Sequence, residues 1–545
     1  MIPARFFEPA LTQGDTCMKN ICFSHIRRDF SFARAANAAG LLALFAVALL
    51  SVGCATPTAV SRETTVQPNE GVAVMRVVNI SGMKVWRIEV IAEASQEKFS
   101  FVGTQFGQTD STTFVGRLPA GRYQPHKLFG SEGLSHIEAP LEKLTGKFDV
   151  EASRITDLAT MIYLPETRSL PLAARELNTS GRGSFRFSLP LDPTPVPTEQ
   201  LLALRFPAIA AVMKGRSSLG WVDGTVPRQT TPLLDSVSKH AAMTGTPVFL
   251  GEGRSVAAGQ LGTVVDRGAT PYSWTHRTTG VVHQLEAITR LKDGRWMVGG
   301  EEGYLAMADT LQGRWNRLPG LSADEVVVSL LQGPDDSVYM VTMNDAGSTV
   351  YQSTPDTINW RVIRRIEGER SKMNFQTPMR LRNSAAISRE RLVVSTLPDT
   401  ISSMDFRTGK WENYETPRPL VAGIKVTADG YLTGTLNGQF RYGSEDHGKT
   451  WRRQEMWLIA SLSDFSERNK GMMISATRGM TIGKYLVRKT EDGGKTWSVI
   501  HEVENERDWI DMPFWIDPID KSGKNLYALR FGRIYNSTDM GATWK

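Results

Sequence analysis

The chain has 545 residues, of which 63 are lysine or arginine, 57 are aspartate or glutamate and 41% are hydrophobic. This length exceeds one compact core, so we expect two or three domains. The net charge of +6 is modest, and the sequence has neither an arginine-rich stripe nor interleaved aromatic and basic residues. Composition therefore argues against nucleic-acid binding.

The first 54 residues have the order of a secretory signal. Arg27 and Arg28 precede the apolar run GLLALFAVALL at 40–50, which is short for a transmembrane span, and SVGC follows it. Val-Gly before Cys54 resembles the bacterial lipobox, with Ser51 where leucine is more usual. This resemblance implies that Cys54 is linked to diacylglycerol and becomes the new N-terminus.

The cysteine count agrees with a lipid anchor. Cys17 and Cys22 lie in the segment that would be removed, so the mature chain keeps only Cys54 and forms no internal disulfide. The residue after Cys54 is not aspartate, which resembles lipoproteins sorted to the outer membrane. We expect a cell-envelope protein facing the periplasm or the surface. An ordinary signal with a buried or disulfide-bonded Cys54 stays open, as does twin-arginine export, because RRDF at 27–30 resembles its core motif.

Two segments separate the signal from the C-terminal repeats. Residues 55–71 are polar and contain prolines, which predicts a tether, and 72–191 alternate in short apolar runs, which predicts an all-β sandwich. FVGRLPAGRY, Phe114 to Tyr123, resembles the transthyretin-like sandwiches of exported proteins and implies an accessory domain. Residues 192–215 read as a linker and a short helix, with Thr198 as its cap and Pro207 as its break.

Residues 216–545 carry an internal repeat. Six phrases that end in tryptophan recur 40 to 51 residues apart, and each follows three short β-type runs split by Gly and Asp turns. A period of about 40 to 50 residues with four short strands is typical of β-propeller blades. The closing tryptophans are Trp315, Trp360, Trp411, Trp451, Trp497 and Trp544. We name the strands of each blade A to D.

The last three phrases, SEDHGKTW, TEDGGKTW and STDMGATW, share the pattern Ser/Thr-x-Asp-x-Gly-x-Thr-Trp. The aspartate can accept backbone N–H bonds of the turn, the glycine permits an unusual backbone angle, and the tryptophan packs between blades. The pattern resembles the Asp-box (BNR) repeat of sialidase-like propellers, which implies a structural turn between strands C and D, opposite the substrate face. The three copies contain Asp446, Gly448 and Trp451; Asp492, Gly494 and Trp497; and Asp539, Gly541 and Trp544.

The number of blades stays open between six and seven. Six repeats lie between 281 and 545, and Thr246 to Trp274 has the pattern of strands B, C and D of a seventh. An open edge on the last blade would be free to pair with other chains. We therefore expect a strand from the other end of the chain to complete that blade and close the ring. Ser218 to Gly224 is the predicted donor for seven blades, and Tyr272 to Arg277 is the donor for six.

The functional face is expected on the loops between strands B and C and between D and A. The B–C loops hold the candidate ligand-binding residues Glu301, Asp345, Arg478 and Arg530. No histidine, cysteine and aspartate cluster has metal-ligand spacing, no glycine-rich loop precedes a helix, and no G-x-S-x-G occurs, so we assign no catalytic residue, metal or cofactor.

Two functions remain. The first is a lipid-anchored, non-enzymatic propeller that binds a protein or glycan ligand of the envelope, and it resembles the photosystem II assembly and stability factor family. The alternative is a sialidase-like glycoside hydrolase with diverged loops. That resemblance implies a three-arginine clamp, a tyrosine nucleophile with a glutamate partner and an aspartate acid/base, none of which can be assigned from the sequence.

Overall fold

The computed structural model divides the chain into 1–54 and 55–545. The residues that it describes all lie in the second unit. They are 56–57, 60–79, 84–104, 111–132, 135–142, 145–163, 196–213, 218–222, 238–239, 241–344, 346–356, 359–368, 385–396, 400–416, 424–436, 440–454, 461–476, 485–503, 514–520, 522–530 and 533–545. Cys54 and the predicted signal fall outside these ranges.

The N-terminal part forms a ten-stranded sheet in the order β10-β9-β2-β5-β4-β3-β6-β7, with β1 paired to β4 and β8 paired to β6. The strands are β1 (Thr56–Pro57), β2 (Glu70–Asn79), β3 (Lys84–Ala92), β4 (Lys98–Thr104), β5 (Ser111–Pro119), β6 (Gly121–Glu132), β7 (Ser135–Pro140), β8 (Phe148–Val150), β9 (Ile155–Tyr163) and β10 (Ser218–Leu219). The all-β character predicted for 72–191 is confirmed in these strands, while their arrangement as a sandwich stays a prediction.

Strand β2 shows why the sheet is buried on both faces. Successive side chains of a strand point to opposite faces. Ala73 and Met75 enter the larger apolar core of the sheet, whereas Val72 and Val74 pack on the other side, against the helices that follow the sheet. By the same alternation, Arg76 points to the face of Val72 and Val74.

The helices are α3 (Thr198–Arg205) and α4 (Pro207–Val212). The predicted break is confirmed, because α3 ends at Arg205 and Pro207 opens α4, where its missing N–H costs no helical bond. The predicted cap is wrong. Pro197 occupies the cap position of α3 without a side-chain bond, and Thr198 is the first helical residue. None of the helices in the described ranges is long and apolar enough to cross a membrane.

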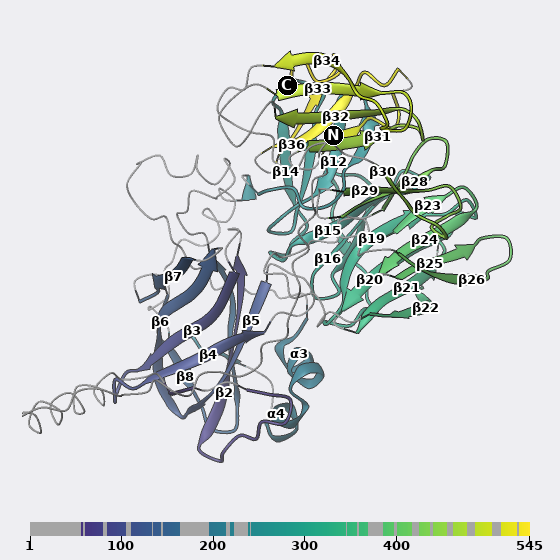
Figure 1. Ribbon diagram of the computed structural model, residues 1–545. Coiled ribbons are helices and arrows are strands. Elements are labelled where there is room, and N and C mark those ends of the chain that lie inside the picture. The colour runs from purple at the N-terminus through teal and green to yellow at the C-terminus, as the bar shows by residue number, and fades with distance from the viewer. Residues whose placement is uncertain are drawn as a thin grey trace, which may run out of the picture. The chain divides into compact units, whose positions relative to one another are not determined.

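Seven sheets follow along the chain, six with four strands and the last with three among the described residues. Figure 1 shows them from teal to yellow. The blades are β11 (Val248–Gly251), β12 (Arg254–Ala258), β13 (Thr263–Arg267) and β14 (Trp274–Thr278); β15 (Leu285–Arg290), β16 (Trp296–Gly300), β17 (Leu305–Ala308) and β18 (Asn316–Arg317); β19 (Val326–Gln332), β20 (Val338–Asn344), β21 (Gly347–Ser353) and β22 (Arg361–Glu367); β23 (Ala385–Ser388), β24 (Arg391–Thr396), β25 (Thr400–Asp405) and β26 (Trp411–Glu415); β27 (Ile424–Val426), β28 (Leu432–Leu436), β29 (Phe440–Ser444) and β30 (Arg452–Gln454); β31 (Ser461–Phe465), β32 (Gly471–Ala476), β33 (Tyr485–Thr490) and β34 (Ser498–Val503); and β35 (Phe514–Ile516), β36 (Leu526–Arg530) and β37 (Arg533–Ser537).

The protein is thus a seven-bladed propeller. The segment predicted to supply strands B, C and D of the extra blade contributes to a complete sheet of four, β11 to β14. The six-blade alternative is wrong, since Tyr272 to Arg277 does not serve the last blade. Residues of this segment form β14, which pairs with β13 as the outer strand of the first blade.

The predicted strand donor, Ser218 to Gly224, is also wrong. Its first residues form β10, which runs parallel to β9 in the N-terminal sheet. The physical reason is Trp221, two residues after β10. Its ring packs edge-on against Phe148 with ring centroids 6.0 Å apart. The indole N–H also donates to the Leu158 carbonyl at 3.0 Å. Trp221 therefore finds both an apolar neighbour and a hydrogen-bond acceptor in the N-terminal sheet.

The ring closes by side-chain packing between its first and last blades. Figure 1 draws β12 and β14 beside β36. Phe249, Val265 and Trp274 of the first blade share a core with Trp515 and Tyr527 of the last. The Trp274 indole N–H donates to the Ile534 carbonyl at 3.1 Å.

A fully buried arginine, Arg267 at the end of β13, completes this closure. Its Nη2 donates to Asn536 Oδ1 at 2.6 Å and to the Lys545 carbonyl at 2.8 Å. Its Nη1 donates to the carbonyl of Gly253 and, at 2.9 Å, to that of Gly268. One guanidinium thus holds together segments of the two ends of the ring.

We predict that Arg267→Met lowers the free energy of unfolding by about 2 to 4 kcal/mol, because it leaves several buried acceptors of the closing blades without a donor. Urea unfolding followed by tryptophan fluorescence measures this loss. Arg254→Met is the matched control, since Arg254 lies exposed on the neighbouring strand β12. Equal stability losses in the two variants would contradict this role for Arg267.

Candidate functional site

The B–C loop of the second blade connects β16 to β17 and carries Glu301 and Glu302. Glu302 has a φ of 49° and Gly303 a φ of 62°. These left-handed angles form a tight turn, closed by the Tyr304 N–H donating to the Glu301 carbonyl at 3.0 Å. Both carboxylates are buried, with Glu301 0% and Glu302 5% exposed.

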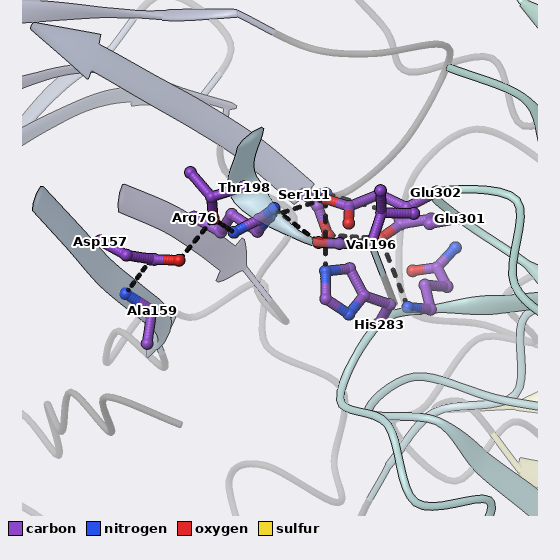
Figure 2. Close-up of polar contacts among 10 residues, drawn as sticks. Arg76, Ser111, Asp157, Ala159, Val196, Thr198, His283, Glu301 and Glu302 are labelled. Atoms are coloured by element: carbon purple, nitrogen blue, oxygen red, sulfur yellow. Dashed lines mark hydrogen bonds and ion pairs between the residues drawn. The ribbon is translucent and has the colours of Figure 1, made fainter. Parts of the chain in front are cut away.

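Arg76 of the N-terminal sheet provides the counter-charge for Glu302 (Figure 2). The Arg76 side chain is fully buried, and its Nε donates to Glu302 Oε1 at 3.1 Å. Its two terminal nitrogens donate to the Thr198 hydroxyl at 3.0 Å and to the Val196 carbonyl at 3.1 Å. The Thr198 hydroxyl, expected to cap the helix, accepts from Arg76 and donates to Asp157 instead. The guanidinium therefore bridges β2, α3 and the propeller.

His283 adds a second basic group beside the same carboxylate. It is fully buried, and its Nε2 lies 3.5 Å from Glu302 Oε1. Burial by itself raises the pKa of the Glu302 carboxyl, but the charge of Arg76, followed by His283, lowers that pKa to about 2. Glu302 is consequently ionised at neutral pH although it is almost fully buried.

Glu301 joins the N-terminal sheet to the propeller through a neutral partner. Its carboxylate accepts from the hydroxyl of Ser111 on β5, and from the Ser111 backbone N–H at 3.3 Å. It also lies 3.4 Å from the Gln284 N–H. Arg76 on β2 pairs with Thr113 on β5, two residues from Ser111, and Figure 2 draws the contacts of Arg76 and Ser111 with the two glutamates of the loop. This cluster therefore fastens the sheet to the second blade.

The four sequence-predicted ligand residues have different outcomes. Glu301 lies in the expected B–C loop, but it is buried against Ser111. Asp345 and Arg478 fall outside the described residues. Arg530 ends β36, and its side chain is not described. The described part of the chain thus brings none of the four together, and their role as a ligand site stays a prediction.

The sequence reasoning missed Arg76 and His283. A signal for Arg76 was present, because it interrupts the run VAVMRVVNI at a position of the same parity as Val72 and Val74. An arginine on an otherwise apolar strand face is rarely buried without a partner. His283, in VVHQLE, had no comparable signal.

The three Ser/Thr-x-Asp-x-Gly-x-Thr-Trp phrases form the same set of hydrogen bonds in their C–D turns. Asp446 Oδ1 accepts from the Thr450 N–H at 2.8 Å and from the Ser444 hydroxyl at 2.8 Å. Its Oδ2 accepts from the Thr450 hydroxyl at 2.6 Å. The Ser444 hydroxyl also accepts from the Gly448 N–H at 2.8 Å. The same four bonds recur around Asp492 and Asp539.

The glycines of these turns lie in the left-handed region, with φ of 92° for Gly448, 91° for Gly494 and 88° for Gly541. A Cβ added to Gly448 would lie 2.8 Å from the Ile401 side chain of the preceding blade. Trp451 packs in the cluster that joins these same two blades. The turn therefore fixes the C–D hairpin and its contact with the neighbouring blade.

Two pairs of polar side chains resemble catalytic groups. The Tyr351 hydroxyl donates to the buried Glu325 carboxylate, with distances of 2.8 and 3.0 Å to its two oxygens. Burial, followed by this hydrogen bond, raises the pKa of Tyr351. A nucleophilic tyrosine needs the opposite shift, because its phenolate must become accessible. This pair is suited to holding β19 and β21 together.

The second pair is Ser388 and His447, with the Ser388 hydroxyl 3.2 Å from His447 Nδ1. Ser388 is fully buried, and its hydroxyl donates to the Gly430 carbonyl at 3.0 Å. A serine nucleophile must reach a substrate and direct its proton to the base. Among the described residues, no group of three or more histidine, cysteine, aspartate or glutamate side chains has a geometry that would hold a metal ion.

Comparisons with known proteins found no matching family model and no matching curated protein. Solved structures similar to this chain include YCF48 bound to D1 peptide, at 16% identity over 54% of this chain and 91% of that one, with a TM-score of 0.39. YCF48 from Cyanidioschyzon merolae is 12% identical over 55% and 95%, with a TM-score of 0.39. The Cps50 (Swd1) propeller of Myceliophteria thermophila is 11% identical over 55% and 97%, with a TM-score of 0.39. The seven-bladed fold stands on the strand pairing described above.

We predict that Asp446→Ala lowers the free energy of unfolding by about 1 to 3 kcal/mol, because the buried Ser444 hydroxyl and both donors of Thr450 lose their acceptor. Partial burial raises the pKa of Asp446, but bonds from Thr450 and Ser444 hold it below its ordinary value. The stabilisation by the Asp446 carboxylate is therefore present above the ordinary pKa of aspartate, about 4. It is lost as the pH falls through the pKa of Asp446 in the folded state.

Thermal unfolding across this pH range measures both effects. The matched control is Glu445→Ala, an exposed neighbour paired only at the surface with Arg468, for which a change below about 1 kcal/mol is expected. A stability gap between wild type and Asp446→Ala that stays constant down to pH 2 would rule out the carboxylate as its source.

We predict that Glu302→Gln destabilises the protein by about 3 kcal/mol, because Arg76 then stays buried without a counter-charge. The pKa of Glu302 is lowered from 4.5 to about 2. Its stabilisation is thus complete above pH 4.5 and disappears as the pH falls toward 2, so the variant and wild type should converge in acid. Differential scanning calorimetry between pH 7 and 3 measures this trend.

Glu367→Gln is the control for that experiment, since Glu367 is exposed at the end of β22. Replacing both partners, in Arg76→Met with Glu302→Met, should restore part of the stability lost in Arg76→Met alone, because no uncompensated charge remains. Additive losses in the double variant would refute a direct interaction of the two side chains.

Proposed function

We propose that this chain is a lipid-anchored protein of the bacterial outer membrane, whose propeller binds a protein or another envelope ligand without catalysing a reaction. The anchor is Cys54, and the N-terminal sheet is a sandwich domain that spaces the ring from the membrane. The remaining B–C loops, with Asp345, Arg478 and Arg530, supply the ligand contacts.

The observation that carries this proposal is that Glu301 and Glu302 are bound by residues of the N-terminal sheet. Both acids of the second B–C loop are buried, and both bind side chains of another part of the polypeptide. A glycosidase acid must meet its substrate in a pocket and exchange protons there. Two carboxylates committed to Arg76 and Ser111 cannot do so. The second B–C loop thus already binds another part of the polypeptide, Arg76 through charge and Ser111 through hydrogen bonds.

One observation favours the alternative, a sialidase-like glycoside hydrolase. Tyr351 and Glu325 form the tyrosine and glutamate pair that such chemistry uses. However, Tyr351 is 7% and Glu325 5% exposed, and the raised pKa of Tyr351 opposes nucleophilic attack. The binding function therefore accounts better for the described residues.

The proposal predicts that Cys54→Ser accumulates as an unprocessed precursor or a soluble species, whereas wild type carries a lipid on Cys54. Mass spectrometry of the mature N-terminus and membrane fractionation measure this outcome. An unmodified mature chain in the wild type would overturn the anchor.

Ligand binding is tested with photo-crosslinkers in the B–C loops of the anchored protein. Arg478→Ala combined with Arg530→Ala should abolish a specific crosslink without lowering the melting temperature. Arg361→Ala combined with Arg365→Ala, on the outer strand β22, is the control and should keep it. Turnover of sialosides by purified wild type, lost on replacing Tyr351 with phenylalanine, would establish the hydrolase instead.

A further inference from the structure

The two helices after the N-terminal sheet expose an apolar face that the propeller does not use. Leu204 on α3 is 40% exposed and Val212 on α4 is 47% exposed. The whole of α4, PAIAAV, is apolar, yet Ile209 is its one buried residue. A helix that faces water normally places polar residues on its outer side. We call the exposed side chains Leu204, Ala211 and Val212 the α3–α4 face.

This face is held on a firm base. Leu201, Leu202 and Ile209, on the inner side of the helices, are buried against Val72 and Val74 of β2. The helices therefore cannot turn inward to hide Leu204 and Val212 without exposing these buried apolar side chains to water. The outward apolar residues are a stable property of the fold.

The chain reaches the same place soon after β1 (Thr56–Pro57), its first described strand, which pairs with β4. Val60 and Val66 pack against the cluster that α3 and α4 form with β2. Val60 follows Cys54 by only six positions in the sequence. A fully extended chain spans at most about 3.6 Å per residue, so Val60 can lie no further than about 22 Å from the anchored cysteine.

We propose that the α3–α4 face lies on the phospholipid bilayer and orients the protein on the membrane. This inference rests on the proposed anchor at Cys54, which holds the cluster of Val60 close to the lipid surface. α4 carries no charged residue, and α3 has one acid in its first turn and one base in its last, Glu199 and Arg205. The contact is therefore hydrophobic and is expected to depend little on salt or anionic lipid.

The test uses the chain from residue 54 onward, with Cys54→Ser and an N-terminal histidine tag held on vesicles of phosphatidylethanolamine and phosphatidylglycerol with a nickel-chelating lipid. Because the natural cysteines of the chain are Cys17, Cys22 and Cys54, Val212→Cys then provides a single site for an environment-sensitive fluorophore. Val499→Cys is the matched control, since Val499 is 51% exposed on the outer strand β34.

We expect the fluorophore at position 212 to shift to the blue on vesicles and to be quenched by lipids with a nitroxide in the acyl chain, while the fluorophore at 499 keeps its aqueous spectrum. Without the tag, Leu204→Gln combined with Val212→Gln should weaken vesicle binding about tenfold or more, from the loss of apolar area. Val362→Gln combined with Val499→Gln should leave it unchanged.

An aqueous spectrum at position 212 on tethered protein would overturn the inference. A blue shift that appears without vesicles and grows with protein concentration would also overturn it, since a second copy would then cover the face. The tag replaces the lipid in this assay, so its outcome does not depend on the modification of Cys54. Mass spectrometry of the cellular protein tests that modification separately.

Discussion

A ring of sheets depends on the contact between its first and last members, because every other neighbouring pair is adjacent in sequence. Here that contact is a shared apolar core around Trp515 and Tyr527, completed by the Arg267 guanidinium. Arg267 and Asn536 are 269 positions apart. Burying a cation is costly unless its donors are satisfied. The carbonyls and the amide oxygen around Arg267 satisfy most of them, so closure is specific as well as apolar.

The attachment of the N-terminal sheet follows the same physical logic. Arg76 and Glu302 lose their water in the contact, and the Coulomb attraction together with the bonds to Thr198 and Val196 offsets that cost. A purely apolar contact would let the sheet slide along the blade. The guanidinium of Arg76 has three partners in fixed directions, so it fits only one position of the sheet. We infer that the pair selects the position of the sheet on the second blade more than it adds net stability.

The features that could be predicted from sequence are those with short-range causes. The blade period and the C–D turns arise from residues within a few positions of one another, such as Asp446 and Thr450, so the pattern is visible in the chain itself. The strand pattern of the additional blade, at Thr246 to Trp274, can be found in the sequence for the same reason. The pairing of Arg76 with Glu302 spans 226 positions and leaves no local pattern.

The errors have the same origin. Thr198 has the residue type of a helix cap, but its hydroxyl is engaged by Arg76 from a distant strand. Ser218 to Gly224 has the pattern of a propeller strand, but the partner of Trp221 is Phe148 in the N-terminal sheet. Glu301 was placed in the correct loop, while its partner Ser111 lies 190 positions away. Local propensity therefore identified the elements, and long-range packing decided their partners.

The buried contact between Arg76 and Glu302 also has a mechanical consequence. The covalent connection between the sheet and the ring runs from β10 to β11, and the ion pair is a second, non-covalent connection in parallel with it. β2, which carries Arg76, is bonded on one side to β5 through nine residue pairs and on the other to β9. A pull on the ring is thus passed directly into the middle of a sheet. A force that pulls the ring away from the sheet would load the connecting chain only after the ion pair of Arg76 and Glu302 had broken.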